Sequence, residues 1–298
     1  MPETFIRENV SDSTICENVS DSTGENNPDA RAVGVFDSGL GGLTAVRSLW
    51  RILPEENLVY FGDTARVPYG TRSRNTILQY ARQDVRLLRT FPLKAIVIAC
   101  GTVSTTSLDE LRRENNLPVI GVVEPACRRA ASVTRNGHVG VIATAASIRS
   151  GAYESALHAT DSTLCVSVQS CPLFVPLVEN GRFHPGDVVI ETIAREYLMP
   201  LLEHHIDTLI LGCTHYPLLS GIISQICGPD VTLVSAGEEA AFELKRLLKQ
   251  SGLRSTGNHH GQTRFYVSDR TDDFENMASV FLQQNLYHTV RRVDIEQF

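Results

Sequence analysis

The feature that most constrains the fold is a pair of short apolar runs that each end in a small residue and a cysteine. One run reads Ala-Ile-Val-Ile-Ala-Cys100 and the other reads Thr-Leu-Ile-Leu-Gly-Cys213. Such runs are typical of parallel strands buried on both faces, and open α/β sheets bind ligands beyond the carboxyl ends of these strands. The two thiols could therefore face one ligand from opposite sides. That geometry suits removal of a proton from one face of a carbon and return of a proton to the other.

The two cysteines belong to a longer repeated order of features. Asp37 and Thr144 each follow an apolar run and lie 107 residues apart, and the two cysteines lie 113 residues apart. Short apolar runs alternate with helical periodicity in both halves, which predicts parallel α/β layers. We expect an α/β protein of two similar parallel-sheet domains, related by pseudo-two-fold symmetry, with the active site in the cleft between them. The expected bounds are a disordered tail over 1–31, a first domain over 32–124 plus 236–298, and a second over 125–235.

The individual elements follow from the same patterns of hydrophobicity. We expect strands over Ala32–Phe36, Leu58–Gly62, Ala95–Ala99, Val119–Val122, Val139–Ile142, Val166–Ser170, Thr208–Leu211 and Thr232–Val234, and helices over Gly42–Leu53, Asn75–Thr90, Ser104–Glu114, Ser150–Ala159, Val188–His204 and Glu238–Gln250.

The amino-terminal segment differs from the rest in being polar and acidic. Its string Glu8-Asn-Val-Ser-Asp-Ser-Thr14 recurs as Glu17-Asn-Val-Ser-Asp-Ser-Thr23. Because so few apolar residues cannot form a packed core, we interpret the segment as a solvated, disordered extension.

Composition narrows the class of function. The chain has 298 residues, 42% hydrophobic, and a net charge of −7, which suits a large core and a small-molecule ligand and gives no basic patch for nucleic acid. No run approaches the roughly 18–20 apolar residues of a membrane helix, and the start is not that of a secretory signal. Seven scattered cysteines fit free thiols in the cytoplasm better than a disulfide framework.

Cys100 and Cys213 stand where a strand is expected to become a helix. A helix amino terminus lowers the pKa of a thiol, which would favour reactive thiolates at both positions. The alternative is that each is a small buried hydrophobe. We prefer that interpretation for the other five, which are Cys16, Cys127, Cys165, Cys171 and Cys227.

Polar residues gather around these strand ends. Asp37 precedes a glycine-rich turn and is either a helix cap or an acid/base partner of a cysteine. Arg66, after a strand, either binds an acidic group or is solvated or structural. His215 shares a loop with Cys213 and can relay its proton, and Glu179 could lie beside it from the adjacent strand. The His204-His205 and His259-His260 pairs lack zinc-type spacing, so no metal is expected.

Three strings together resemble the glutamate racemases of the aspartate/glutamate racemase superfamily, from about Val33 to the carboxyl terminus. They are Gly-Val-Phe-Asp37-Ser38-Gly-Leu-Gly-Gly-Leu-Thr, Tyr-Phe-Gly-Asp-Thr-Ala-Arg-Val-Pro-Tyr-Gly70 and Leu-Gly-Cys213-Thr-His215-Tyr-Pro-Leu-Leu. The resemblance implies a bacterial cytoplasmic isomerase that needs no cofactor and no metal. It would interconvert L- and D-glutamate, supply D-glutamate for peptidoglycan and so for cell wall and cell shape, and form a homodimer.

The resemblance also implies site residues. Cys100 and Cys213 would be acid and base on opposite faces of the α-carbon, with Asp37 assisting the first, and His215 and Glu179 the second. The positions that match substrate-holding positions of the family are Asp37, Ser38, Pro68, Tyr69, Gly70, Gly101, Thr102, Thr144, Ser147, Thr214 and His215.

Two positions depart from the family's pattern. Ser147 stands where the family often has Thr, and its hydroxyl keeps a hydrogen-bond donor. Gly101 stands where the family usually has Asn, which removes an amide donor and acceptor. Gly101 therefore leaves open a related two-cysteine racemase that acts on aspartate or another amino acid. A binding or regulatory protein that has lost turnover is the alternative outside enzymes.

Overall fold

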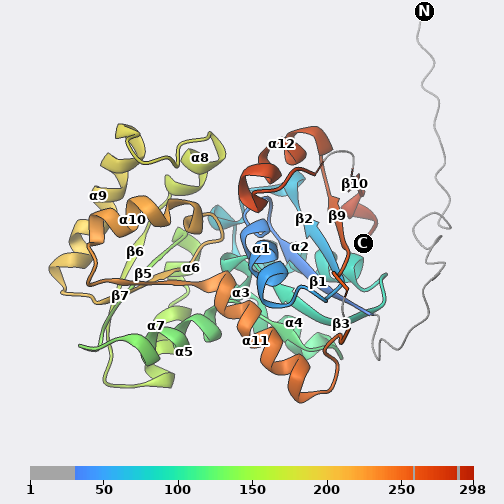
Figure 1. Ribbon diagram of the computed structural model, residues 1–298, viewed down its shortest axis with the longest axis horizontal. Coiled ribbons are helices and arrows are strands. Elements are labelled where there is room, and N and C mark those ends of the chain that lie inside the picture. Colours follow the sequence, from blue (N-terminus) through green and yellow to red (C-terminus); the bar gives the residue numbers. More distant parts are fainter. Residues whose placement is uncertain (1–30, 258, 287–288) are drawn as a thin grey trace, which may run out of the picture.

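The computed structural model describes residues 31–257, 259–286 and 289–298. The predicted tail, with its repeat and Cys16, lies outside the described residues apart from Arg31. The described chain forms two parallel-sheet α/β domains, as predicted, which lie side by side in Figure 1. The residue bounds given above for the two domains stay a prediction.

The first sheet has six strands in the order β10-β9-β2-β1-β3-β4, and every neighbouring pair is parallel. The central strands β1, β2 and β3 are apolar and almost wholly buried because helices cover both faces of the sheet. The strands are β1 (Ala32–Asp37), β2 (Leu58–Gly62), β3 (Leu93–Ile98), β4 (Val119–Ile120), β9 (Thr263–Val267) and β10 (Val290–Arg292).

The second sheet has four parallel strands in the order β6-β5-β7-β8. Its central strands, β5 and β7, end just before Thr144 and Cys213 respectively, so both residues lie at the carboxyl edge of the sheet. The strands are β5 (His138–Ala143), β6 (Cys165–Ser170), β7 (Thr208–Leu211) and β8 (Thr232–Ser235).

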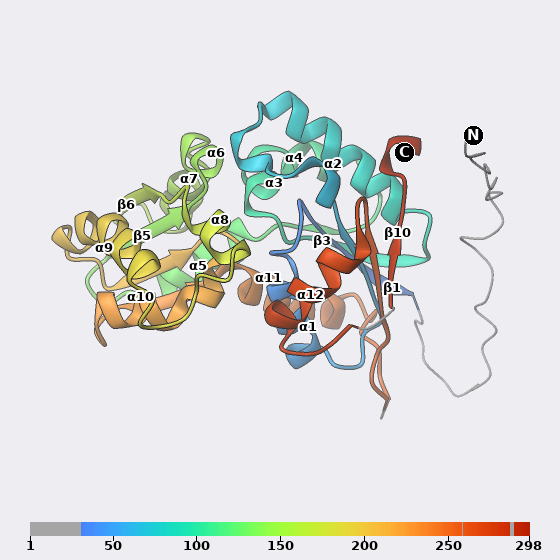
Figure 2. The same ribbon diagram turned by 90° about the horizontal axis from the view of Figure 1, so that it is seen from above.

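Helices cover both faces of the first sheet: Figure 2 shows α2, α3 and α4 on one side, and α1 and α12 on the other. Helix α11 packs against α1 and against α5, and so contacts elements of both domains. The described helices are α1 (Leu43–Ile52), α2 (Arg74–Leu88), α3 (Gly101–Thr106), α4 (Leu108–Glu114), α5 (Val123–Val133), α6 (Ala145–Arg149), α7 (Ala152–Thr160), α8 (Phe174–Glu179), α9 (Val188–Glu203), α10 (Ser220–Cys227), α11 (Ala236–Gln250) and α12 (Thr271–Leu282), with short 3-10 turns η1 (Thr64–Arg66), η2 (Tyr69–Thr71), η3 (Tyr216–Leu219) and η4 (Ile295–Gln297).

One predicted helix is divided in the structure. The helix expected over Ser104–Glu114 becomes α3 and α4, because Ser107 has backbone angles of φ −138° and ψ −2° that leave the helical region. Just before that break, Ser104 donates its hydroxyl to the carbonyl of Ile98 and accepts from the amide of Val122, which ties α3 to the two strand ends beside it.

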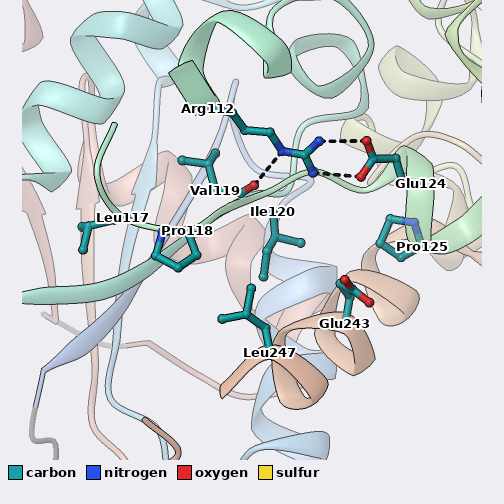
Figure 3. A pocket seen from close by; sticks show the side chains of 10 residues that line it. Arg112, Leu117, Pro118, Val119, Ile120, Glu124, Pro125, Glu243 and Leu247 are labelled. Carbon is teal, nitrogen blue, oxygen red and sulfur yellow. Dashed lines mark hydrogen bonds and ion pairs between the residues drawn. The ribbon is translucent and has the colours of Figure 1, made fainter. Parts of the chain in front are cut away.

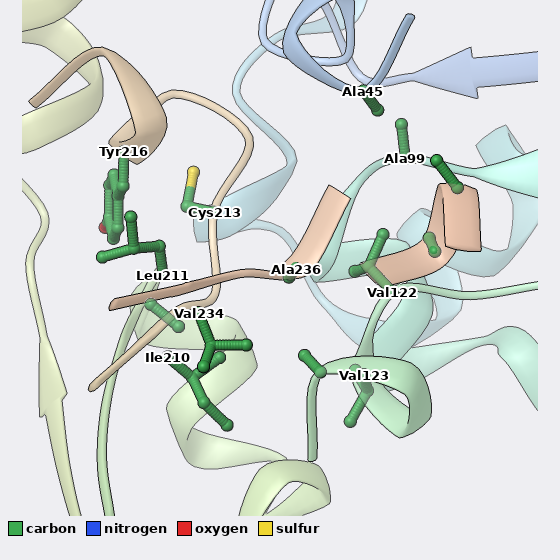
Figure 4. Packing of buried hydrophobic residues seen from close by; sticks show 14 of the residues in the cluster. Ala45, Ala99, Val122, Val123, Ile210, Leu211, Cys213, Tyr216, Val234 and Ala236 are labelled. Atoms are coloured by element: carbon green, nitrogen blue, oxygen red, sulfur yellow. The ribbon is translucent and has the colours of Figure 1, made fainter. Parts of the chain in front are cut away.

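A single buried apolar cluster extends from the first domain into the second. Ala45 and Ala99 belong to the first domain's side, and Ile210 and Val234 to the second sheet; Figure 4 shows them on the two sides of Ala236. The two domains therefore share core packing along the start of α11. No helix in the described part of the chain is long and apolar enough to cross a membrane.

A cavity of about 340 Å³ lies between α4, β4 and α11. Figure 3 shows the Arg112 guanidinium paired with the Glu124 carboxylate at one side, at 2.8 and 2.9 Å, and Leu247 at the other. Neither Cys100 nor Cys213 lines this cavity.

Candidate active site

Cys100 lies two residues beyond β3 and caps the amino terminus of α3. Its side chain is 4% exposed and donates to the hydroxyl of Ser38 over 3.4 Å. Burial, followed by the charge of Asp37, raises the pKa of Cys100 to about 12. The prediction that the helix start lowers this pKa is therefore wrong, because desolvation outweighs the effect of a helix of six residues.

Asp37 is the last residue of β1 and is 1% exposed. One carboxylate oxygen accepts from the amide of Gly39 over 3.1 Å, while Oδ1 is buried without a partner among the described residues. Burial raises the pKa of Asp37, and the nearby charge of His215 and backbone amides oppose that shift. A buried carboxylate oxygen without a partner can receive a hydrogen-bond donor of a ligand.

Cys213 lies two residues beyond β7 and is 8% exposed. Its sulfur lies 3.9 Å from Nδ1 of His215, and Nε2 of His215 lies 3.0 Å from a carboxylate oxygen of Glu179. Burial alone would lower the pKa of His215, but the hydrogen bonds to Cys213 and Glu179 outweigh it and raise the pKa to about 10. The imidazole is therefore positively charged at neutral pH.

Two expectations about this second site need correction. Glu179 reaches His215 as predicted, but from the last turn of α8, not from a strand. Cys213 does not begin a helix directly: a turn follows it, and the 3-10 turn η3 begins only at Tyr216. The sequence Phe-Val-Pro-Leu-Val-Glu contains proline and β-branched residues, which hid the short helix.

The two cysteine loops touch through glycine residues. A Cβ atom added at Gly101 would lie 2.4 Å from the carbonyl oxygen of Gly212. A Cβ added at Gly41 would lie 2.1 Å from Oγ1 of Thr214, and Thr44 donates to the carbonyl of Thr214 over 2.8 Å. The glycine-rich turn after β1 and the loop after β3 are thus both packed against the loop that carries the second thiol.

Hydroxyl groups bridge α3 and α6 beside the cysteines. Thr102 and Thr144 place their Oγ1 atoms 3.0 Å apart, and Thr144 lies 3.0 Å from Oγ of Ser147. Thr105, which the sequence did not single out, donates to Ser147 over 3.3 Å. These residues come from both domains, so a ligand that replaced some of their mutual hydrogen bonds would contact both domains.

The Pro68-Tyr69-Gly70 turn is adjacent to the same hydroxyls. A Cβ added at Gly70 would lie 3.2 Å from Cβ of Thr144. The ring of Tyr69 is 1% exposed, and its hydroxyl donates to Asp63 and to Asp84. The side chain of Tyr69 thus points into the protein, and the main chain of the turn is what faces Thr144.

Arg66 is structural, which was one of its two expected roles, but it is not solvated. It is 9% exposed and donates to Asp63 over 2.6 Å and to Asp84 over 3.1 Å. The sequence reasoning missed Asp63 and Asp84. Asp84 could have been found, because the helical spacing of Ile77 and Leu88 places it on the apolar face of α2, where a carboxylate needs a partner.

The remaining cysteines differ in their burial. Cys127 and Cys171 are buried as expected and Cys227 is partly buried, but Cys165 is exposed at the start of β6. All six described cysteines are free thiols. Within the described residues, no group of three or more His, Cys, Asp or Glu side chains could hold a metal ion.

Comparison with known proteins places this arrangement among racemases. The sequence pattern of the Asp/Glu/hydantoin racemase family matches residues 43–244. The glutamate racemase of Geobacter metallireducens is 43% identical over 252 residues, which cover 85% of this chain and 93% of that protein. A glutamate racemase of Neisseria meningitidis is 44% identical over 263 residues, covering 88% and 96%.

Solved structures agree with the sequence comparison. A glutamate racemase isoform of Bacillus anthracis superimposes with a TM-score of 0.85 and 40% identity, covering 89% of this chain and 97% of that one. The glutamate racemase of Francisella tularensis in complex with D-glutamate gives a TM-score of 0.83 and 38% identity, covering 91% and 100%.

Proposed function

The chain belongs to the Asp/Glu/hydantoin racemase family, and from that premise we propose that it is a cofactor-independent glutamate racemase that uses two cysteines. One observation carries the proposal. Cys100 and Cys213 lie at the carboxyl edges of two different sheets, on loops that touch at Gly101 and Gly212. In this proposal, a small ligand held between these loops would have a buried sulfur on each side.

The reaction needs one thiolate and one thiol at the same time. The thiolate removes the α-proton of glutamate: the C–H bond breaks, an S–H bond forms, and the electron pair remains on a carbanion next to the carboxylate. The thiol on the opposite face then gives its proton to that carbon. The net result is inversion of the carbon and transfer of one proton from one cysteine to the other.

The neighbours of the two sulfurs suit these unequal roles. Burial and the charge of Asp37 disfavour a thiolate on Cys100, whereas the sulfur of Cys213 lies 3.9 Å from His215, which Glu179 holds. For the enzyme without substrate we therefore assign Cys100 the role of the acid and, by elimination, Cys213 the role of the base. Burial of both groups keeps water from reprotonating the carbanion.

Substrate contacts are proposed around the same loops. The unpaired Oδ1 of Asp37 would accept from the ammonium group of glutamate. Hydroxyl and main-chain groups would hold the two carboxylates of the substrate. Hydrogen bonds to the carboxylates would replace some of the hydrogen bonds that these groups make with one another. These groups belong to Ser38, Pro68, Tyr69, Gly70, Gly101, Thr102, Thr144, Ser147, Thr214 and His215.

Single-cysteine variants test the mechanism. In D₂O, the wild-type protein should exchange the α-proton of both enantiomers and interconvert them. Cys100→Ser and Cys213→Ser should each retain exchange of one enantiomer, a different one in each variant, and should not racemise. The matched control is Cys127→Ser, a buried cysteine outside the site, which should behave as wild type.

The outcomes distinguish the alternatives. Unimpaired racemisation in both cysteine variants would refute the two-cysteine mechanism. Absence of any proton exchange in the wild-type protein would favour a binding or regulatory role instead of an enzyme. Racemisation is followed by circular dichroism with no added cofactor, and exchange by NMR.

Aspartate is the second candidate substrate. Gly101 lacks the amide of the family's usual Asn, and its backbone packs directly against Gly212. Both features bear on the part of the site that would hold the substrate. A kcat/KM for aspartate that exceeds the kcat/KM for glutamate would establish this alternative.

The biological setting is proposed on the family resemblance. The protein would act in the bacterial cytoplasm, supply D-glutamate for peptidoglycan, and thereby support cell shape. Growth of a D-glutamate auxotroph on expression of the chain tests this role, and failure to restore growth by an active enzyme contradicts it. We also propose a homodimer, which sedimentation velocity would reveal by a mass of twice 32.8 kDa.

A further inference from the structure

A buried polar cluster lies directly behind the Pro68-Tyr69-Gly70 turn. Its members are Asp63 after β2, Arg66 in η1, Tyr69 in the turn and Asp84 in α2. Asp63 and Asp84 are 0% exposed, Tyr69 is 1% and Arg66 is 9% exposed. These ionisable groups are therefore gathered out of water next to the proposed substrate site.

The guanidinium of Arg66 donates a hydrogen bond to a buried side chain from each of its three nitrogens. Nε donates to Asp63 over 2.6 Å, Nη1 to the side chain of Gln83 over 2.5 Å, and Nη2 to Asp84 over 3.1 Å. Its plane also lies over the ring of Tyr80, with Cζ 4.2 Å from the ring centre. A rigid fork of this kind fixes the relative positions of its partners, which a lysine cannot do.

The two carboxylates are fixed by other elements. Oδ1 of Asp63 accepts from the hydroxyl of Ser268, which follows β9, over 2.8 Å, and Ser268 in turn accepts from the amide of Ala65 over 2.9 Å. Asp84 lies in the middle of the long helix α2. The cluster is therefore attached to rigid parts of the first domain.

The hydroxyl of Tyr69 connects the cluster to the turn. It donates to Asp63 and, over 3.2 Å, to Oδ2 of Asp84. The next residue, Gly70, packs against Thr144 of the other domain, so the ring of Tyr69 lies beside the contact between the turn and that threonine.

An ion cluster of this kind is a costly way to obtain stability alone. Taking charges out of water is unfavourable, and packed apolar side chains of similar volume are often as stable. Unlike apolar packing, directional hydrogen bonds to an aromatic hydroxyl fix both the orientation and the position of one loop residue.

We propose that Arg66, Asp63 and Asp84 are positioning residues that act through the hydroxyl of Tyr69 to hold the main chain at Tyr69 and Gly70 in the conformation that binds a substrate carboxylate. The proposal rests on the proposed function, since it assumes that glutamate occupies the site beside Thr144. In this proposal, the side chain of Tyr69 does not contact the substrate.

The sharpest test is Tyr69→Phe, which removes one oxygen atom and keeps the ring. The matched control is Tyr80→Phe, because Tyr80 packs against the ring of Tyr69 at 5.4 Å but its hydroxyl makes none of the contacts above. Arg66→Lys keeps the charge and removes the fork. For each variant we would measure the melting temperature, kcat and KM for both enantiomers.

Binding is measured separately from turnover. Calorimetric titration of D-glutamate into the Cys100→Ser/Cys213→Ser protein, with and without Tyr69→Phe, gives the dissociation constant without chemistry. We expect Tyr69→Phe to raise KM and the dissociation constant about tenfold, the effect of one lost hydrogen bond to a charged group, with kcat within about twofold of wild type. Arg66→Lys should do the same, and Tyr80→Phe should change neither constant.

Two results would overturn the inference while leaving the proposed function intact. One is a lower melting temperature of Tyr69→Phe with unchanged KM and dissociation constant, which is the signature of a purely structural cluster. The other is a loss of kcat without a change in KM. A wild-type protein that neither binds nor turns over glutamate would refute both the proposed function and this inference.

Discussion

Replacement of Gly101 by alanine should slow racemisation severely without unfolding the protein. Gly101 is the first residue of α3, where alanine is otherwise a favourable residue. The new Cβ would lie 2.4 Å from the carbonyl oxygen of Gly212, whereas ordinary contacts of this kind are about 3.4 Å. The Cβ is held in place by the backbone of residue 101 and the oxygen belongs to the main chain of Gly212, so the clash is relieved only if the two cysteine loops separate by about 1 Å.

The size of the effect follows from that displacement. A misplacement of reacting groups by about 1 Å can cost about 100-fold in rate. This factor corresponds to about 2.7 kcal/mol in the activation free energy. Because the two enantiomers have equal free energies in solution, kcat/KM must fall by the same factor in both directions.

The assay is circular dichroism of L- and D-glutamate, with thermal unfolding to confirm the fold. Gly221→Ala is the matched control: it also lies near the start of a helix, and its nearest neighbour is the Pro185 side chain at 3.9 Å. Gly101→Asn adds the family's amide to the same steric change, so its comparison with Gly101→Ala isolates the amide. Activity of Gly101→Ala within threefold of wild type would refute the reasoning, because the loops would then separate without consequence.

Two further substitutions test the electrostatics. Glu179→Gln should lower the pKa of His215 from about 10. The raised pKa stabilises the fold fully below the unfolded value of about 6.5, and this stabilisation is lost as pH rises to 10, so the loss of stability in the variant should become smaller over this range. Urea unfolding measures that loss, and a loss that does not depend on pH would contradict the assignment. Lys94→Met should destabilise the protein by about 3–5 kcal/mol, because it leaves the Glu56 carboxylate buried without the ammonium group that lies 2.6 Å away. Arg51→Met removes one partner of an exposed ion pair and should cost less than about 1 kcal/mol. Equal losses of stability in the two variants would contradict the role of burial.

The strands that sequence predicts well are those whose whole length is buried. β2 and β7 have the predicted bounds because helices cover both faces and the apolar run is uninterrupted. β9 and β10 were missed, since Thr-Arg-Phe-Tyr-Val and Val-Arg-Arg are short and their arginines interrupt the apolar pattern. They form only because β2 offers a free edge, a tertiary fact that no local pattern contains.

The site shows the same division between local and tertiary information. The contact of Cys213 with His215 was predicted because the two residues share one loop. The pairing of Thr105 with Ser147, and of Arg66 with Asp84, joins segments whose proximity depends on how helices pack. The pKa of Cys100 was predicted in the wrong direction for a related reason: burial is a property of the folded protein, and here it outweighs the local effect of the helix terminus.

The unequal surroundings of the two cysteines have a consequence for turnover under the proposed mechanism. Inversion of one enantiomer moves a proton from Cys100 to Cys213, which leaves a thiolate beside Asp37 and a thiol beside the charged His215. The first of these changes is unfavourable, because burial and the charge of Asp37 raise the pKa of Cys100. The free enzyme must then return this proton before it can bind the first enantiomer again. Since the solution equilibrium fixes the ratio of kcat/KM between directions, the asymmetry can appear only in the separate values of kcat and KM, which should differ between L- and D-glutamate and converge when Asp37 is replaced by asparagine.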